Sequence, residues 1–153
     1  MYEVAEGQDK IMLLAYLQLG ARRSEVLRLR WEDVDFREGR TRLTIRKRMR
    51  GSLEEDWLPL RDELFHALLT HRQTNRSEWV FPDPRTGKPD EQRQHRMKEL
   101  SAWAGVRHFV LHAIRHLTAS ILANEGVPLI LIQVCCGPKF PTPPSAICID
   151  WRN

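Results

Sequence analysis

The sequence predicts a mainly helical α+β fold, with several helices around one small antiparallel β-hairpin. Apolar residues recur at helical spacing in several segments, one segment alternates polar and apolar residues, and clusters of Gly and Pro separate these elements. The length of 153 residues suits one domain. With 42% hydrophobic and 29% charged residues, the composition excludes disordered and fibrous classes.

The first elements are helical. Residues Gln8–Leu19 carry apolar side chains at helical spacing, and Gly20 is a suitable stop. A second, short helix is expected from Ser24 to near Trp31, followed by a turn over 32–35.

The pattern then changes to that of a hairpin. From Arg40 to Arg46, arginine and threonine alternate with apolar residues, which indicates a strand with one polar face. Gly51 and Ser52 supply a reversal, and a second strand over Asp56–Leu60 closes at Pro59.

Helical spacing returns over 61–73, 91–104 and 112–124, with a Pro/Gly loop over 82–89 and a last apolar segment over 128–134. Gly126 marks the end of the 112–124 helix. We expect Trp31, Trp57 and Trp79 in the core. Beyond Gly137 the chain is rich in proline, so we predict a folded unit over 1–136 and a disordered tail over 137–153.

The charge distribution points to a polyanionic partner. The net charge is +4, yet residues 22–50 contain eleven bases and five acids, a local excess of +6. Arginine offers a planar fork of donors to phosphate oxygens. A solvated surface of mixed charge explains the same composition.

Other sites and compartments find little support. The longest apolar runs fall short of the roughly 20 residues of a spanning helix, and no signal peptide is visible, so we expect a cytoplasmic protein without a membrane partner. The cysteines, Cys135, Cys136 and Cys148, match no zinc or redox spacing.

Three motifs follow one another in the chain. The first runs from Gly20 through Arg22 and Glu25 to a Trp31-Glu32-Asp33 turn, the second is the hairpin with Lys47, and the third is the box His112-Ala113-Ile114-Arg115-His116. In this order they resemble the motifs of tyrosine recombinases, the phage integrase family.

The resemblance implies a catalytic-domain fold of that family and a site for DNA strand transesterification. It also implies that the protein is encoded by a bacterium or a phage and is associated with the nucleoid. Arg22 and Arg115 would stabilise the charge that develops on the phosphate, Lys47 would act as general acid, and His112 would assist proton transfer. Glu25 would support Arg22. The further DNA-binding residues would be Arg23, Arg46, Arg48, Arg50 and His116. No cofactor, metal or small-molecule substrate is implied.

The nucleophile departs from the family pattern. The family uses a tyrosine about thirty residues after the box, whereas this sequence contains only Tyr2 and Tyr16. Read one frame over from near Gln133–Val134, the codons of the tail permit Glu-Arg-Tyr-Leu-His-Arg-Leu. We therefore hypothesise that this chain is a truncated catalytic domain whose tail is frameshifted and which is inactive because the nucleophile is missing. The family consists of enzymes, so whether this chain is itself an enzyme stays open.

Three alternatives remain. A non-catalytic DNA-binding or regulatory fragment could compete with a full-length recombinase or join its oligomer. The expected partner is double-stranded DNA, and a full-length recombinase or a second copy of this chain could be a further partner. His108, His112 and His116 could hold a metal in an unrelated hydrolase. Arg22 and Glu25 could form a mere surface ion pair.

Overall fold

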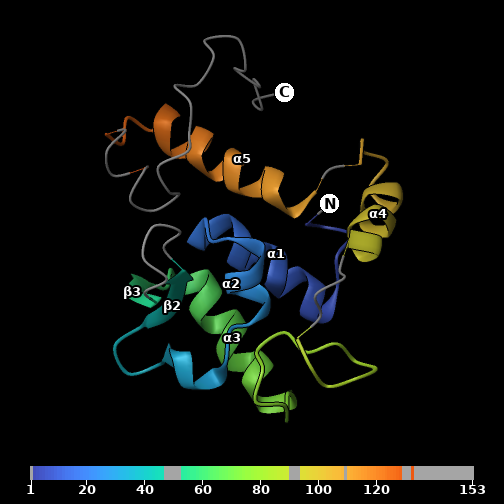
Figure 1. The fold of residues 1–153 in the computed structure, drawn as a ribbon. Coiled ribbons are helices and arrows are strands. Elements are labelled where there is room, and N and C mark those ends of the chain that lie inside the picture. Colours follow the sequence, from blue (N-terminus) through green and yellow to red (C-terminus); the bar gives the residue numbers. More distant parts are fainter. Residues whose placement is uncertain (1, 47–52, 90–93, 109, 129–131, 133–153) are drawn as a thin grey trace.

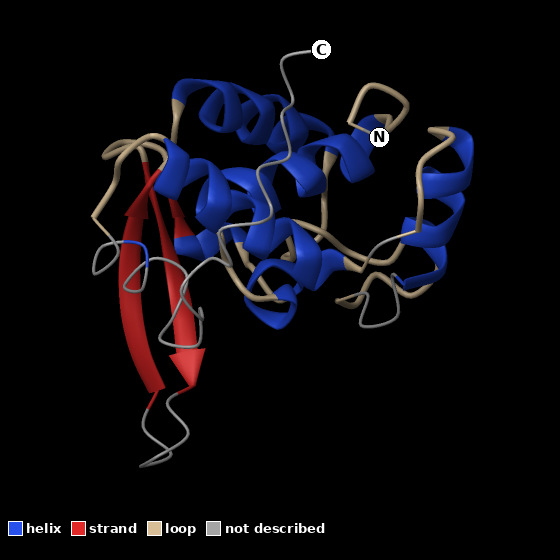
Figure 2. Ribbon diagram, turned by 90° about the horizontal axis from the view of Figure 1, so that it is seen from above, coloured by secondary structure: helices blue, strands red, loops and turns tan. Residues whose placement is uncertain are grey.

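The computed structural model describes residues 2–46, 53–89, 94–108, 110–128 and 132. This part is mostly helical and contains a three-stranded antiparallel sheet, which confirms the predicted fold class. The helices lie to one side of the sheet, and the two long strands extend beyond them (Figure 2). No helix among the described residues is long and apolar enough to cross a membrane.

Helix α1, Gly7–Leu19, is the centre of the fold (Figure 1). It contacts α2, α3 and α5, and buried side chains occur on most of its turns, including Met12, Leu13 and Tyr16. The helix stops where Gly20 takes a left-handed conformation, with φ of 56°, and donates its N–H to the carbonyl of Tyr16 over 3.1 Å. A residue with a Cβ would be strained there.

The second helix is shorter than predicted. Helix α2 covers Arg23–Leu27, and a 3₁₀ helix, η1, follows at Trp31–Asp33 instead of a plain turn. The reason is tertiary: the N–H of Val80 donates to the carbonyl of Leu29, and the N–H of Trp31 donates to that of Glu78. These two bonds hold the chain extended between α2 and η1, because the same backbone groups cannot also serve a helix.

The sheet has the order β1-β2-β3, formed by Val34–Asp35, Arg40–Arg46 and Leu53–Pro59. Strand β1 was not predicted, and β3 begins three residues before the predicted strand but closes at Pro59 as expected. Thr41 and Leu43 of β2 are buried, so Arg42 and Thr44 face outward.

The prediction that Trp57 is a core residue is wrong. Its register partner is Arg42, which places Trp57 on the outer face of the sheet, and Trp57 is 44% exposed. The guanidinium of Arg40 lies 4.6 Å from the centre of its ring. Trp31, in contrast, is buried as predicted, and Trp79 is half-buried.

The remaining helices are α3, Asp62–Thr74, α4, Gln94–Trp103, and α5, Leu111–Asn124. The bounds of α3 and α5 agree with the prediction to within one residue. Helix α5 packs across α1, and Ile132 packs against Ala119 of α5. The apolar segment over 128–134 falls mostly outside the described residues, as do the boundary at 136 and the tail.

Candidate functional site

Arg22 is the N-cap residue just before α2 and is held there by Glu25. The main-chain N–H of Arg22 donates to Glu25 Oε2 over 2.7 Å, and its Nη1 lies 3.3 Å from Glu25 Oε1. The carbonyl of Arg22 accepts from the N–H groups of Glu25 and Val26. The side chain of Glu25 is only 7% exposed, whereas that of Arg22 is 44% exposed. A buried carboxylate therefore anchors a guanidinium that still reaches solvent.

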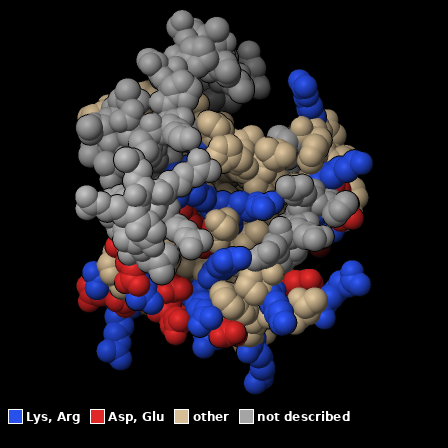
Figure 3. All heavy atoms as spheres, in the orientation of Figure 1, with Lys and Arg blue, Asp and Glu red and all other residues tan. Residues whose placement is uncertain are grey.

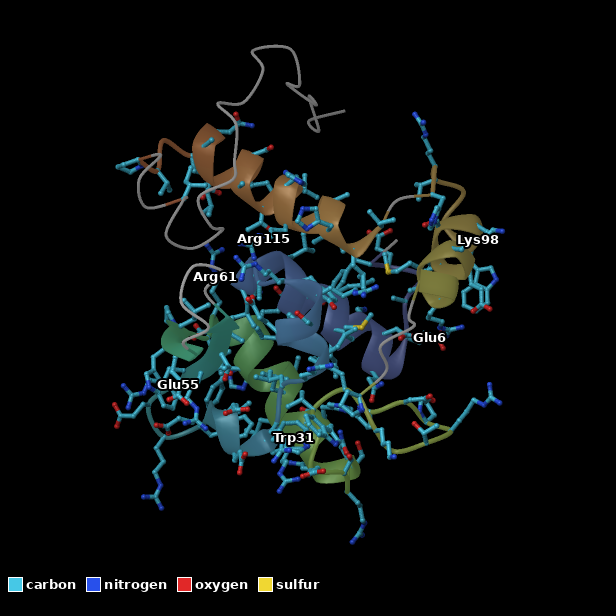
Figure 4. All side chains as sticks on the ribbon, in the orientation of Figure 1. Glu6, Trp31, Glu55, Arg61, Lys98 and Arg115 are labelled. Carbon is cyan, nitrogen blue, oxygen red and sulfur yellow. The ribbon has the colours of Figure 1, made fainter. Side chains whose placement is uncertain are left out.

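Helix α5 carries the third motif. Arg115 is buried, with 7% of its surface exposed, while His112 and His116 are exposed. The two imidazole rings lie one turn apart, with their centres 4.8 Å from each other and their planes nearly perpendicular. Figure 4 shows Arg115 in the space between α5 and the pair α1 and α2.

Arg22 contributes to the electrostatic environment of this helix. The pKa of His112 lies below its ordinary value, first because protein atoms displace water from part of its ring, and then because of the charges of His116, Arg115 and Arg22. Helices α2 and α5 both pack against α1, so the first and third motifs lie on elements that share one neighbour. Lys and Arg side chains cross the middle of the face seen in Figure 3.

A cleft of about 760 Å³ runs from Arg22 along the outer face of β2. Its lining includes Arg28, Arg30, Arg42 and Thr44 together with acidic residues, but neither His112 nor Arg115 is part of it. Besides Arg22, two of its arginines are paired: Nη2 of Arg42 lies 2.8 Å from Asp33 Oδ1, and Nη1 of Arg30 lies 3.4 Å from Glu32 Oε1. Glu32 and Asp33 are among the five acids already counted, so only the further pairs of Arg42 with Glu55 and of Arg30 with Glu78 offset part of the excess over 22–50.

The other predicted DNA-binding residues are placed only in part. Arg23 is the exposed first residue of α2, and Arg46 is the last residue of β2. Lys47, Arg48 and Arg50 lie outside the described residues, so the role of Lys47 as general acid stays a prediction.

Neither tyrosine of the sequence is placed as a nucleophile. Tyr16 is 1% exposed, and its hydroxyl donates to the carbonyl of Arg23 over 3.2 Å. The hydroxyl of Tyr2 donates to Glu63 Oε1 over 3.2 Å, and its pKa is raised, chiefly by burial and then by the Glu63 carboxylate. Both hydroxyls are thus engaged in hydrogen bonds to other groups.

Metal ligands do not cluster in the described part of the chain. There, no group of three or more His, Cys, Asp and Glu side chains is arranged to hold a metal ion. The alternative of a metal-dependent hydrolase therefore has no site among these residues.

One contact that the sequence did not reveal ties the two halves of the site together. The hydroxyl of Thr118, in α5, donates to the carbonyl of Leu17, in α1, over 3.0 Å. No pattern in the sequence marks this pair, because the partners are 101 residues apart and a threonine within a helix more often bonds its own turn.

The chain is similar in sequence to known tyrosine recombinases. The chain is 31% identical over 146 residues to the tyrosine recombinase XerD of Proteus mirabilis, an alignment that covers 88% of this chain and 45% of that protein. It is 30% identical over 144 residues to XerD of Vibrio cholerae, covering 86% and 46%. The chain thus spans about half the length of these relatives.

Solved structures share the fold. The XerA recombinase superposes with a TM-score of 0.75 at 19% identity, covering 91% of this chain and 51% of that one. The integrase from mycobacterium phage Brujita gives 0.71 at 23% identity, covering 92% and 47%. The Tn1549 transposon integrase in complex with circular intermediate DNA gives 0.71 at 18% identity, covering 87% and 50%.

The model of the phage integrase family matches residues 1–139, which include both halves of the site. The chain therefore belongs to the phage integrase family.

Proposed function

We propose that this chain is part of the catalytic domain of a site-specific DNA recombinase and binds a DNA phosphodiester between Arg22 and the α5 residues His112 and Arg115. The observation that carries the proposal is that Arg22, anchored by Glu25 at the start of α2, and Arg115, buried on α5, come from segments far apart in the sequence that both pack on α1. A site that concentrates positive charge in this way suits an anion.

The two arginines suit the chemistry of phosphoryl transfer. Negative charge grows on the non-bridging oxygens in the transition state, and fixed guanidinium donors stabilise it without a metal. Glu25 would keep the Arg22 guanidinium in place through its bond of 3.3 Å. The buried Arg115 would keep its charge at the floor of the site. The ion pair of Arg22 with Glu25 thus has a function beyond surface stability.

The lowered pKa of His112 suits a proton acceptor. Its imidazole would be neutral near pH 7 and could take a proton from an attacking hydroxyl. Lys47 would donate a proton to the leaving 5′-oxygen, as the family resemblance implies. No cofactor is needed for this reaction.

The relatives support DNA as the partner. The Tn1549 integrase was solved with circular intermediate DNA, and XerH with its palindromic difH substrate. By analogy, double-stranded DNA would lie across the face that presents Arg22 and His112, and Arg23 and His116 would add contacts at the rim. Residues 46–50 of the hairpin would supply further phosphate contacts. The partner could also include a full-length recombinase or a second copy.

We further propose that this chain binds DNA without cleaving it. Of its two tyrosines, Tyr16 is buried and Tyr2 donates to Glu63, so neither hydroxyl is available to attack a phosphate. A non-catalytic DNA-binding role, in competition with an intact recombinase, is therefore the second candidate function.

The test of binding is the affinity for a fluorescent DNA duplex as a function of salt. Removing one phosphate contact, with Arg22→Gln, is expected to weaken binding and to reduce the salt slope by about one. Arg85→Gln, in the exposed loop over 82–89, is the matched control and should leave both unchanged. Equal affinities for wild type and Arg22→Gln would overturn the proposal.

The test of cleavage is a suicide substrate, which traps a covalent protein–DNA adduct in an active recombinase. We expect no adduct with this chain at protein concentrations that saturate binding. An adduct would overturn the inactive interpretation and leave the DNA-binding proposal in place.

A further inference from the structure

The last turn of α1 lies between the two halves of the proposed phosphate site. Arg22 follows Leu19, the last residue of α1, by three positions, and α5 packs across α1 (Figure 1). The last carbonyls of any helix lack partners within it. This turn therefore offers acceptors that other elements can bind.

Thr118 uses one of these acceptors. Its hydroxyl donates to the Leu17 carbonyl over 3.0 Å, and Thr118 is 7% exposed. A second acceptor, the carbonyl of Ile114, lies 3.1 Å away in the same helix, so of these two bonds of Thr118 the one to Leu17 links α5 to α1. Thr118 follows Arg115 by three positions, which places the bond one turn along the same face of α5.

Tyr16 holds the other half of the site. Its hydroxyl donates to the Arg23 carbonyl over 3.2 Å, and its own carbonyl accepts the Gly20 N–H over 3.1 Å. The two bonds bracket Arg22 on both sides along the chain. Because Tyr16 is 1% exposed, the ring is packed and the hydroxyl has little freedom.

We propose that Tyr16 and Thr118 are positioning residues that set the spacing between Arg22 and the α5 side chains His112 and Arg115. Tyr16 and Leu17 are adjacent in α1, so the hydrogen bonds that hold the Arg22 segment and α5 are made by neighbouring residues of one helix. This inference rests on the proposed function, since Arg22 and Arg115 must act together on one phosphate for their spacing to matter.

The test removes one hydroxyl at a time. In Tyr16→Phe and Thr118→Val, we expect the dissociation constant for a fluorescent DNA duplex to rise about fivefold, the equivalent of one hydrogen bond. The pKa of His112, followed by NMR of its ring, should rise, because the charge of Arg22 would lie farther from it on average, whereas Arg115 stays beside it on the same helix. His116, on the same face, remains in place and serves as an internal reference for helix α5.

Matched controls separate positioning from general loss of a hydroxyl. Tyr2→Phe removes the bond to Glu63, away from α2, and Ser120→Ala removes a bond within α5, from the Ser120 hydroxyl to the His116 carbonyl. Both controls should leave DNA affinity and the pKa of His112 unchanged. If all four variants have the same effect, the proposal is wrong.

A double-mutant cycle distinguishes positioning from stability. In the Arg22→Gln background, Tyr16→Phe should cause no further loss of DNA affinity, because the residue through which it acts is gone. An additive loss would overturn the positioning role. If Arg22→Gln alone leaves DNA affinity unchanged, the proposed function fails, while the His112 titration in Tyr16→Phe still decides whether Tyr16 holds Arg22 in place.

Discussion

The carboxylate of Asp9, in the first turn of α1, accepts a hydrogen bond of 2.6 Å from Nε of Arg96 in α4. Asp9 is 9% exposed. The same guanidinium lies 2.9 Å from Glu99 and 4.9 Å from the centre of the Trp103 ring. One arginine thus ties α4 to α1 and also stabilises its own helix.

This pair predicts the effect of Asp9→Asn. The variant keeps the shape but loses the charge, and we expect about 1 kcal/mol less stability, because Arg96 is partly exposed to solvent. Urea unfolding measures the loss, and amide hydrogen exchange should rise mainly in α4. Glu99→Gln, whose carboxylate is more than half exposed, is the control and should cost about 0.5 kcal/mol or less. Unchanged amide hydrogen exchange in α4 would show that the bond between Asp9 and Arg96 does not hold α4 against α1.

The anchoring of Arg22 predicts a second loss of stability. Glu25→Ala leaves the N–H of Arg22 without its acceptor and removes the cap of α2, at a cost of about 1–2 kcal/mol. DNA affinity should fall as well, since the guanidinium of Arg22 loses its support. Glu32→Ala, an exposed acid nearby, should affect neither stability nor DNA affinity by a comparable amount. Equal costs for the two variants would show that Glu25 is an ordinary surface acid.

The lowered pKa of His112 predicts a pH dependence of stability. Between the native pKa and the ordinary value of about 6.5, the unfolded chain binds more protons than the folded one, so stability rises with pH. The contribution of His112 is therefore fully present above about pH 6.5 and is lost as the pH falls through its native pKa. His112→Gln should reduce the slope of unfolding free energy against pH in this window. Identical slopes for variant and wild type would refute the assignment.

Trp31 is buried in the core and Trp57 lies on the outer face of the sheet, so their replacement is expected to lower the stability by different amounts. Trp31→Ala should destabilise the protein by about 3–5 kcal/mol, because a buried indole leaves a cavity. Trp57→Ala should cost about 1 kcal/mol, mainly through its contacts with Arg40 and Arg42. Thermal or urea unfolding compares the two directly. A large cost for Trp57→Ala would place it in the core after all.

The errors of the sequence-based prediction have a common origin. The second helix ends at Leu27 because Leu29 and Trp31 pair with residues 78–80, a segment distant in the chain. Trp57 is exposed because its register with Arg42 directs it outward, and apolar character alone does not reveal which face of a strand is covered. In both cases a contact across the chain overrides a local preference.

The sequence by itself determined the helical periodicities, the hairpin, the stop at Gly20 and the order of the three motifs, because each depends on residues within a few positions of one another. Only the tertiary structure decided that α2 and α5 both pack on α1, that Thr118 bonds Leu17, and that Tyr16 is buried rather than reactive. These relations depend on how α5 packs on α1. Packing is settled by the sum of many weak contacts over the whole domain, and no short stretch of sequence contains that sum.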